Sequence, residues 1–183
     1  MTRHVMLMRS INLGSKNKVP MSALREVIAR AGGRDVRSYI QSGNVVFDTD
    51  DAPGSPAADD IADATVHWLR DDLGLDLPVI VLPAAEFREM AKRNPFLADG
   101  ADEDHCHLMV LSVVPDRDRA ATLDPERSPG DRAVLAGQAL YLHLPNGAAR
   151  SRWTNDYVDR RLGVVSTARN WRTVRAIVAL LDA

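Results

Sequence analysis

The sequence predicts an α+β protein made by tandem duplication of ferredoxin-like (βαββαβ) α/β sandwich halves, one in residues 1–82 and one in residues 83–183. Strand and helix patterns follow the order βαββαβ through the first half, and the same order returns more loosely in the second half. Two predicted hairpins, at residues 35–47 and 131–141, also resemble each other, although ordinary hairpin similarity is an alternative explanation. Hydrophobic residues make up 45% of the 183 residues, so a core can form.

The elements of the first half follow from their patterns. Residues 3–9 form a mostly apolar run typical of a buried strand, and residues 10–18 form a polar loop. Pro20 suits a first helical turn, and the helix that follows is expected to end at Gly32 and Gly33. The later elements are expected as hairpin strands at 36–40 and 45–47, a helix at 58–73 and a strand at 78–82.

The second half is expected to repeat this order after a linking helix at residues 83–93. Its last helix is amphipathic, because Trp171, Val174, Val178 and Leu181 recur at helical spacing. The other elements are expected as a strand at 105–113, a short helix at 115–123, hairpin strands at 132–135 and 139–144, a helix at 151–162 and a strand remnant at 164–165.

Composition excludes several classes of protein. The longest apolar stretches span only four to six residues, whereas a transmembrane helix needs about 20. The N-terminus lacks the longer apolar core and the cleavage site of a signal peptide, so secretion is not expected. The single cysteine, Cys106, excludes an internal disulfide and suits a reducing compartment. We therefore expect a cytoplasmic protein with no membrane partner.

The charges are distributed unevenly along the chain. Residues 1–47 carry a balance of +6, and residues 145–183 carry +4. Residues 48–76 carry −8 and residues 77–144 carry −4, which gives the overall net charge of −2. If the two cationic ends meet in the fold, they form one positive face.

Five short motifs occur in order along essentially the whole chain. They are residues 9–18 (RSINLGSKNK), 39–47 (YIQSGNVVF), 94–96 (NPF), 144–147 (LPNG) and 169–174 (RNWRTV). Together they resemble a bacterial family catalogued as domain of unknown function 1697, which usually has Gly where this chain has Ser10 and Ser15. The resemblance implies a small bacterial α+β protein and implies no activity.

The first loop is a candidate phosphate-binding segment. It is polar and cationic and follows a strand directly, and such loops hold phosphate through backbone N–H groups and lysine. Two of the chain's three lysines lie in it, but the P-loop spacing is absent, and a solvated loop is the alternative. The candidate ligand-binding residues in this half are Arg9, Asn12, Lys16, Lys18, Ser42 and Asn44.

A dense group of polar residues near the C-terminus is a second candidate. Ser151 and Thr167 are expected at helix starts, where the ordinary role of such residues is N-capping. The same helix ends could instead direct free N–H groups at an anion, aided by Arg150 or Arg169. The candidate ligand-binding residues in this half are Asn146, Ser151, Thr154, Asn155, Thr167, Arg169 and Asn170.

Other chemistries find little support. His105 and His107 would share one face of a strand and Cys106 the other, so the three cannot converge on a metal. The GxSxG, HExxH, GxGxxG and CxxC signatures are absent. We expect no metal, no cofactor and no assignable catalytic residue, and we expect Trp153, Tyr157 and Trp171 to be core residues rather than base-stacking platforms.

These observations favour a phosphate-recognising binding protein. Its partner would be a small phosphate-containing molecule such as a nucleotide, or a nucleic acid, held in a cationic cleft where the 9–18 loop meets the 146–173 cluster. One alternative is an enzyme acting on a small phosphorylated or acyl substrate at the same place, with Lys16 or Asp156 as the reactive group. The other is a homo-oligomeric interaction module in which Trp153 and Trp171 are surface contacts.

Overall fold

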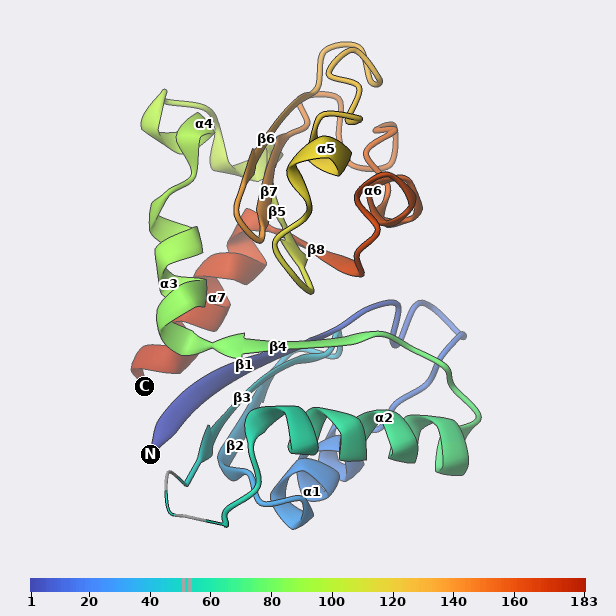
Figure 1. Cartoon of the computed structure of the whole chain (residues 1–183), viewed down its shortest axis with the longest axis vertical. Coiled ribbons are helices and arrows are strands. Elements are labelled where there is room, and N and C mark those ends of the chain that lie inside the picture. Colours follow the sequence, from blue (N-terminus) through green and yellow to red (C-terminus); the bar gives the residue numbers. More distant parts are fainter. Residues whose placement is uncertain (51, 53) are drawn as a thin grey trace. The chain divides into compact units, whose positions relative to one another are not determined.

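The computed structural model describes residues 1–50, 52 and 54–183, and the chain divides into two compact units (Figure 1). Unit 1 comprises Met1–Arg88 together with Ala176–Ala183, and unit 2 comprises Glu89–Arg175. The elements in chain order are β1 (Thr2–Met8), α1 (Met21–Arg30), β2 (Arg34–Tyr39), β3 (Asn44–Thr49), α2 (Ala58–Leu73), β4 (Val79–Pro83), α3 (Ala84–Lys92), α4 (Pro95–Ala98), the 3-10 turn η1 (Glu103–His105), β5 (Cys106–Leu111), α5 (Arg117–Ala120), β6 (Arg132–Ala136), β7 (Ala139–His143), α6 (Asn155–Leu162), β8 (Ser166–Asn170) and α7 (Trp171–Asp182).

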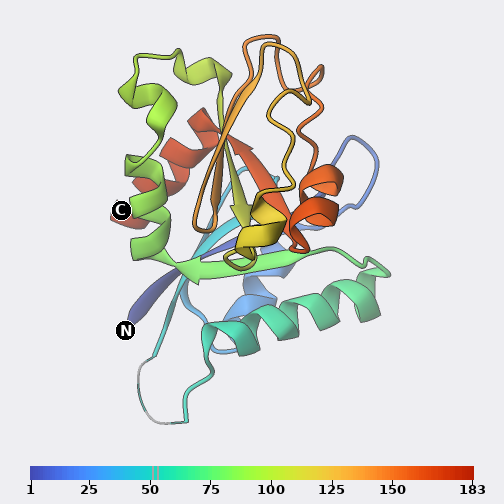
Figure 2. The same ribbon diagram turned by 45° about the horizontal axis from the view of Figure 1, so that its top comes forward.

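Unit 1 contains a four-stranded antiparallel sheet in the order β2-β3-β1-β4. The central strand β1 pairs Val5 with Val46 of β3 on one side and with Leu82 of β4 on the other. Helices α1 and α2 lie on the same side of this sheet (Figures 1 and 2). Side chains that alternate along the strands, such as Met6 and Phe47, are fully buried in the core that these helices cover.

Unit 2 repeats this topology with the order β6-β7-β5-β8, in which β5 is central and pairs Leu108 with Tyr141 of β7 and Arg169 of β8. Helices α5 and α6 lie together on one side of this sheet (Figure 2). The core on that side includes Met109 of β5 and Trp153. Both units therefore have the βαββαβ order, and the predicted tandem ferredoxin-like fold is confirmed.

The tryptophans near the C-terminus are buried. Trp153 is 5% exposed and Trp171, the first residue of α7, is 4% exposed. Tyr157 packs edge-on against Trp153 with ring centroids 5.6 Å apart. The prediction that these rings are core residues is confirmed, and a surface-contact role for Trp153 and Trp171 is wrong because their side chains are not accessible.

The structure corrects several predicted boundaries in unit 2. The helix expected from Ser151 begins at Asn155, and Thr154 is its N-cap. Thr167, expected at a helix start, lies inside β8, which replaces the strand remnant expected at residues 164–165. His105 lies in η1 rather than in the following strand.

None of the helices in the described part of the chain combines the length and the apolar character needed to cross a bilayer.

Candidate functional site

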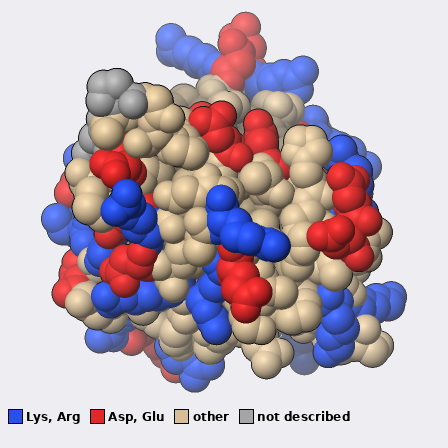
Figure 3. All heavy atoms as spheres, turned by 90° about the horizontal axis from the view of Figure 1, so that it is seen from below, with Lys and Arg blue, Asp and Glu red and all other residues tan. Residues whose placement is uncertain are grey.

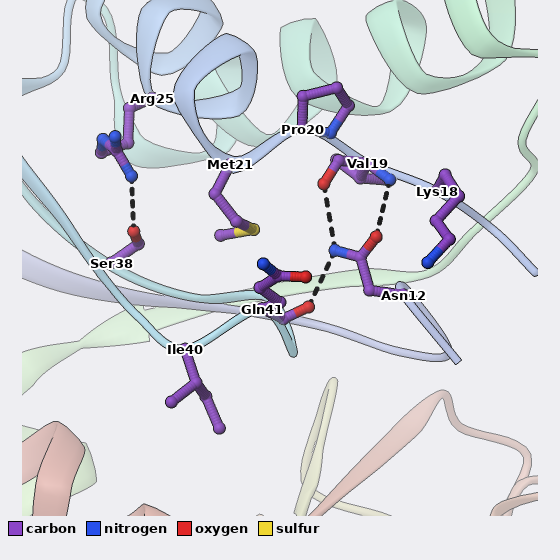
Figure 4. A pocket seen from close by; sticks show the side chains of 9 residues that line it. All are labelled: Asn12, Lys18, Val19, Pro20, Met21, Arg25, Ser38, Ile40 and Gln41. Carbon is purple, nitrogen blue, oxygen red and sulfur yellow. Dashed lines mark hydrogen bonds between the residues drawn. The ribbon is translucent and has the colours of Figure 1, made fainter. Parts of the chain in front are cut away.

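Unit 1 contains a pocket of about 460 Å³ (Figure 4). It lies where the first loop, the start of α1 and the connection between β2 and β3 come together. The described residues that line it are Asn12, Lys18, Val19, Pro20, Met21, Arg25, Ser38, Ile40 and Gln41.

Asn12 holds the three segments of the pocket in place. Its amide nitrogen donates to the backbone oxygens of Val19 at 3.0 Å and Gln41 at 2.8 Å, and its amide oxygen accepts from the Val19 backbone N–H at 2.9 Å. Figure 4 shows these three bonds running from one side chain to the entry of α1 and to the β2–β3 connection. The side chain of Asn12 is therefore committed to the wall of the pocket.

The loop itself has an unusual backbone. Four of its residues have left-handed φ angles: Ser10 at 62°, Asn12 at 51°, Gly14 at 56° and Asn17 at 51°. The amide nitrogen of Asn17 donates to the Ser10 carbonyl at 2.7 Å, and the Asn12 N–H donates to the Asn17 carbonyl at 2.9 Å. The φ angle of Ser10 is left-handed, and glycine, which is usual at this position in the family that the sequence resembles, adopts such an angle without steric penalty.

The connection between β2 and β3 is also tightly defined. The Met8 N–H donates to the Gly43 carbonyl at 2.9 Å, which joins this connection to the end of β1. A Cβ on Gly43 would lie 2.6 Å from the Cβ of Met8, and Gly43 has a φ of +72°, so only glycine fits here. The amide of Asn44 donates to the Ser42 hydroxyl at 2.9 Å. Ile40 has a φ of 46°, a strained angle for a β-branched residue.

Two cationic side chains line the pocket. Lys18 comes from the loop, and Arg25 comes from the second turn of α1, where its guanidinium donates to the Ser38 hydroxyl of β2 at 2.8 Å. No carboxylate is among the described lining residues, and neither cation forms an ion pair within the described chain. Helix α1 also starts at this pocket, and Pro20 at its N-cap gives no side-chain cap to the first N–H groups. The pocket is therefore electropositive.

The structure brings together only some of the predicted residues of unit 1. Asn12 and Lys18 line the pocket, whereas Arg9, Lys16, Ser42 and Asn44 are not part of its lining. Sequence reasoning missed the other seven lining residues, which are Val19, Pro20, Met21, Arg25, Ser38, Ile40 and Gln41. The helical spacing of Met21 and Arg25 could have placed these two on one face of α1, but nothing in the sequence pairs Arg25 with Ser38.

Most predicted residues of unit 2 make local hydrogen bonds. The Thr154 hydroxyl accepts from the Tyr157 N–H at 3.3 Å as the N-cap of α6, and the Asn155 amide donates to the Ser166 hydroxyl at 2.9 Å. The Ser151 hydroxyl accepts from the Trp153 N–H at 3.1 Å.

The remaining predicted residues of unit 2 lie in or beside β8, apart from the exposed Asn146. The Asn170 side chain accepts from the Thr173 N–H at 2.9 Å in the first turn of α7. Arg169 is buried, donates to the Thr167 hydroxyl at 2.8 Å, and has a pKa lowered by burial to about 10. The expected meeting of the first loop with this cluster stays a prediction.

No group of three or more potential metal ligands converges in the described part of the chain. Cys106 is fully buried, and burial raises the pKa of its thiol. A buried thiol of this kind behaves as a small apolar group.

The surface over α1 and α2 does not form a second cationic site. In Figure 3, which views the molecule from below, acidic and basic side chains are interspersed on this face, with no large area of one sign among the coloured residues. Anion binding by unit 1 would therefore depend on the pocket rather than on this face.

Comparisons with known proteins identify relatives but no activity. The model of a family described as "Protein of unknown function (DUF1697)" matches residues 1–141. The solved structure of the conserved bacterial protein SP0830 from Streptococcus pneumoniae is similar in fold, with a TM-score of 0.76 and 20% sequence identity over 100% of this chain and 99% of that chain. No curated protein matches the chain.

Proposed function

The chain belongs to the DUF1697 family of proteins of unknown function, and we propose that it binds a phosphate-containing ligand in the unit 1 pocket. The ligand is a nucleotide or a segment of nucleic acid. The observation that carries this proposal is the presence of Lys18 and Arg25 in a pocket whose described lining contains no carboxylate.

The electrostatics of the pocket suit an anion. A phosphate gains charge-assisted hydrogen bonds from lysine and arginine, each about 1.5–3 kcal/mol gross. The uncapped start of α1 adds positive potential on the same side, because the first backbone N–H groups of a helix have no intrahelical acceptor. A neutral ligand would leave both cations without a counter-charge.

The size and remaining lining of the pocket favour a ligand larger than inorganic phosphate. A volume of about 460 Å³ lies within the range of roughly 300–1,000 Å³ that is usual for small-molecule sites. Met21 and Pro20 supply apolar surface, and the side chain of the exposed Gln41 can both donate and accept hydrogen bonds. This mixture suits a nucleotide, which combines a phosphate with a flat, polar-edged ring.

The test is a thermal-shift screen with nucleotides, phosphosugars and short oligonucleotides, followed by calorimetric titration of the best ligands. Lys18→Ala should lower the affinity by about tenfold or more, because each tenfold change corresponds to about 1.4 kcal/mol. Lys16→Ala is the matched control, since Lys16 is an exposed lysine of the same loop that does not line the pocket. Its effect should stay below about threefold at 0.15 M salt, because salt screens the interaction of the ligand with a charge that lies outside the pocket.

Two results would count against the proposal. One is a wild-type protein that no phosphate compound stabilises, because ligand at about 100 times its Kd should add about 2.7 kcal/mol to the free energy of unfolding. The other is equal loss of affinity in Lys18→Ala and Lys16→Ala, which would indicate a diffuse charge effect rather than a pocket.

A further inference from the structure

We infer that the pocket binds a ligand with two separate phosphate groups, one held at Lys18 and the other at Arg25. This inference rests on the proposed function and specifies the class of ligand. It follows from the placement of the two cations within the pocket.

The two cations occupy different ends of the pocket. Arg25 lies one helical turn beyond Met21, about 6 Å along the axis of α1, whereas Lys18 precedes Met21 in the loop that leads into the helix. In Figure 4 the two side chains stand apart, with Met21 and Gln41 between them. One phosphate group placed against either cation would leave the other without a counter-charge.

Each cation is held in its own place. The Arg25 guanidinium is anchored by its bond of 2.8 Å to the Ser38 hydroxyl, and it retains further N–H donors for a ligand. Lys18 leads directly into Val19, whose backbone N–H and carbonyl are both bound by Asn12. The backbone beside Lys18 cannot swing toward Arg25 without breaking these bonds. The two positive charges therefore act as separate contacts rather than as one clamp.

The middle of the pocket is suited to the group that joins the two phosphates. The thioether side chain of Met21 is half-buried and points into the space between the cations (Figure 4). Methionine is polarizable and packs well against aromatic rings. Gln41 faces it from the β2–β3 connection and offers both a donor and an acceptor to a base or sugar edge. A nucleoside carrying phosphates on both its 3′ and 5′ oxygens has this arrangement of charge and ring.

Two natural sources share this chemistry. One is a free nucleoside bisphosphate, and the other is a single strand of nucleic acid, in which every internal nucleoside is flanked by two phosphates. The strand differs from the free molecule in its dependence on salt, because each neutralised phosphate of a single strand contributes a slope of about −0.7 to log K against log salt. Two phosphates held in the pocket predict a slope of about −1.4.

The experiment is calorimetric titration of the full chain with adenosine 3′,5′-bisphosphate and with adenosine 5′-monophosphate. The bisphosphate should bind at least about tenfold more tightly, since the second phosphate adds one charge-assisted contact. Lys18→Ala and Arg25→Ala should each lower the bisphosphate affinity about tenfold, and their effects should multiply to about 100-fold in the double variant. For the monophosphate, only one of the two variants should have an effect of this size.

Controls separate binding from folding. Arg30→Ala removes an exposed arginine of α1 outside the pocket and should leave both affinities within about twofold. Arg25→Gln keeps a hydrogen-bonding group for Ser38 and serves if Arg25→Ala unfolds. An octathymidylate that binds at least about tenfold more tightly than the bisphosphate, with a slope of about −1.4, would identify the strand as the source. Weaker binding of the oligonucleotide would identify the free bisphosphate.

Each remaining outcome overturns a definite claim. Equal affinity for the mono- and bisphosphate, or equal losses of monophosphate affinity in both single variants, would show a single-anion site and overturn this inference while leaving phosphate binding intact. Failure of the wild-type protein to bind either compound or the oligonucleotide would overturn both this inference and the proposed function.

Discussion

Replacing Asn12 by glycine tests how strongly one side chain stabilises the pocket. Asn12 has a φ of 51°, which glycine adopts without strain, so the substitution removes the side-chain bonds and leaves the backbone angle acceptable. Three hydrogen bonds are lost, two to Val19 and one to Gln41. At about 1 kcal/mol each, the loss of these bonds alone should lower the free energy of unfolding of unit 1 by about 3 kcal/mol.

Asn17→Gly is a closely matched control. Asn17 lies in the same loop with the same φ of 51°, but its side chain makes one hydrogen bond, to the Ser10 carbonyl. The entropy that a new glycine adds to the unfolded chain is the same in both variants and cancels in their difference. Asn12→Gly should therefore be less stable than Asn17→Gly by about 2 kcal/mol, the contribution of two bonds.

The assay is urea unfolding monitored by circular dichroism. With a slope of about 1–3 kcal/mol per M, a difference of about 2 kcal/mol separates the two midpoints by roughly 0.7–2 M urea. Because a chain with two units can unfold in more than one step, the earlier and later transitions should be fitted separately. Equal midpoints for Asn12→Gly and Asn17→Gly would refute the claim that Asn12 holds the pocket together.

Three further predictions concern other parts of the chain. Gly43→Ala should lower the free energy of unfolding by more than about 3 kcal/mol, because the new Cβ would lie 2.6 Å from the Cβ of Met8 and the residue has a φ of +72°. Gly14→Ala, where a new Cβ meets no atom within 4 Å, should lower it by only about 1–2 kcal/mol. Similar losses for the two variants in urea titrations would contradict the steric argument. Cys106 is fully buried with its pKa raised by burial, so a thiol reagent should label it slowly in the native protein and rapidly in urea, and rapid native labelling would refute its burial. Burial lowers the pKa of His107, so the unfolded chain binds a proton more readily than the folded chain, and the free energy of unfolding should fall as the pH drops below about 6.5. His107→Gln should reduce the pH dependence of this free energy measured between pH 7 and pH 5. An unchanged pH dependence would exclude His107 as a cause.

The order of elements could be predicted because it depends on local patterns. Residues 45–47 are entirely apolar and the helix of residues 58–73 ends at Gly74, which has the left-handed φ of 65° expected of a C-cap. The β8 strand could not be predicted in this way, because its sequence, Ser166–Asn170, has neither apolar alternation nor a turn on its C-terminal side. Its pairing with β5 determines its conformation, and α7 begins at the next residue.

The misplaced helix starts have a related cause. Serine and threonine hydroxyls accept backbone hydrogen bonds in turns as well as at N-caps, so their presence before an apolar pattern does not identify the cap. Ser151 makes such a bond in a turn, to the N–H of Trp153, and the cap is Thr154. Likewise Asn170 binds the first turn of α7, whereas Thr167 is buried within the sheet.

The residues of the candidate pocket, too, could be predicted only in part from the sequence. The loop that contains Asn12 and Lys18 could be predicted from its polarity and its position after a strand. Arg25 and Ser38 could not, because they lie on a helix and a strand that only the folded sheet brings to within 2.8 Å of each other. Packing brings residues that are far apart in the sequence into one site, and neither composition nor motif spacing predicts which residues meet in this way.

The strained backbone around the pocket bears on how a ligand would bind. Ser10 and Ile40 keep left-handed angles that cost an L-residue about 1–2 kcal/mol, and a solvated, unconstrained loop would relax them. They persist because the bonds of Asn12, Asn17 and Gly43 fix the neighbouring backbone. Because the loop is already ordered, ligand binding does not have to offset the loss of backbone entropy that ordering would cost, about 1–2 kcal/mol per residue. Asn12→Gly should therefore weaken both folding and phosphate binding, whereas Lys18→Ala should weaken phosphate binding alone.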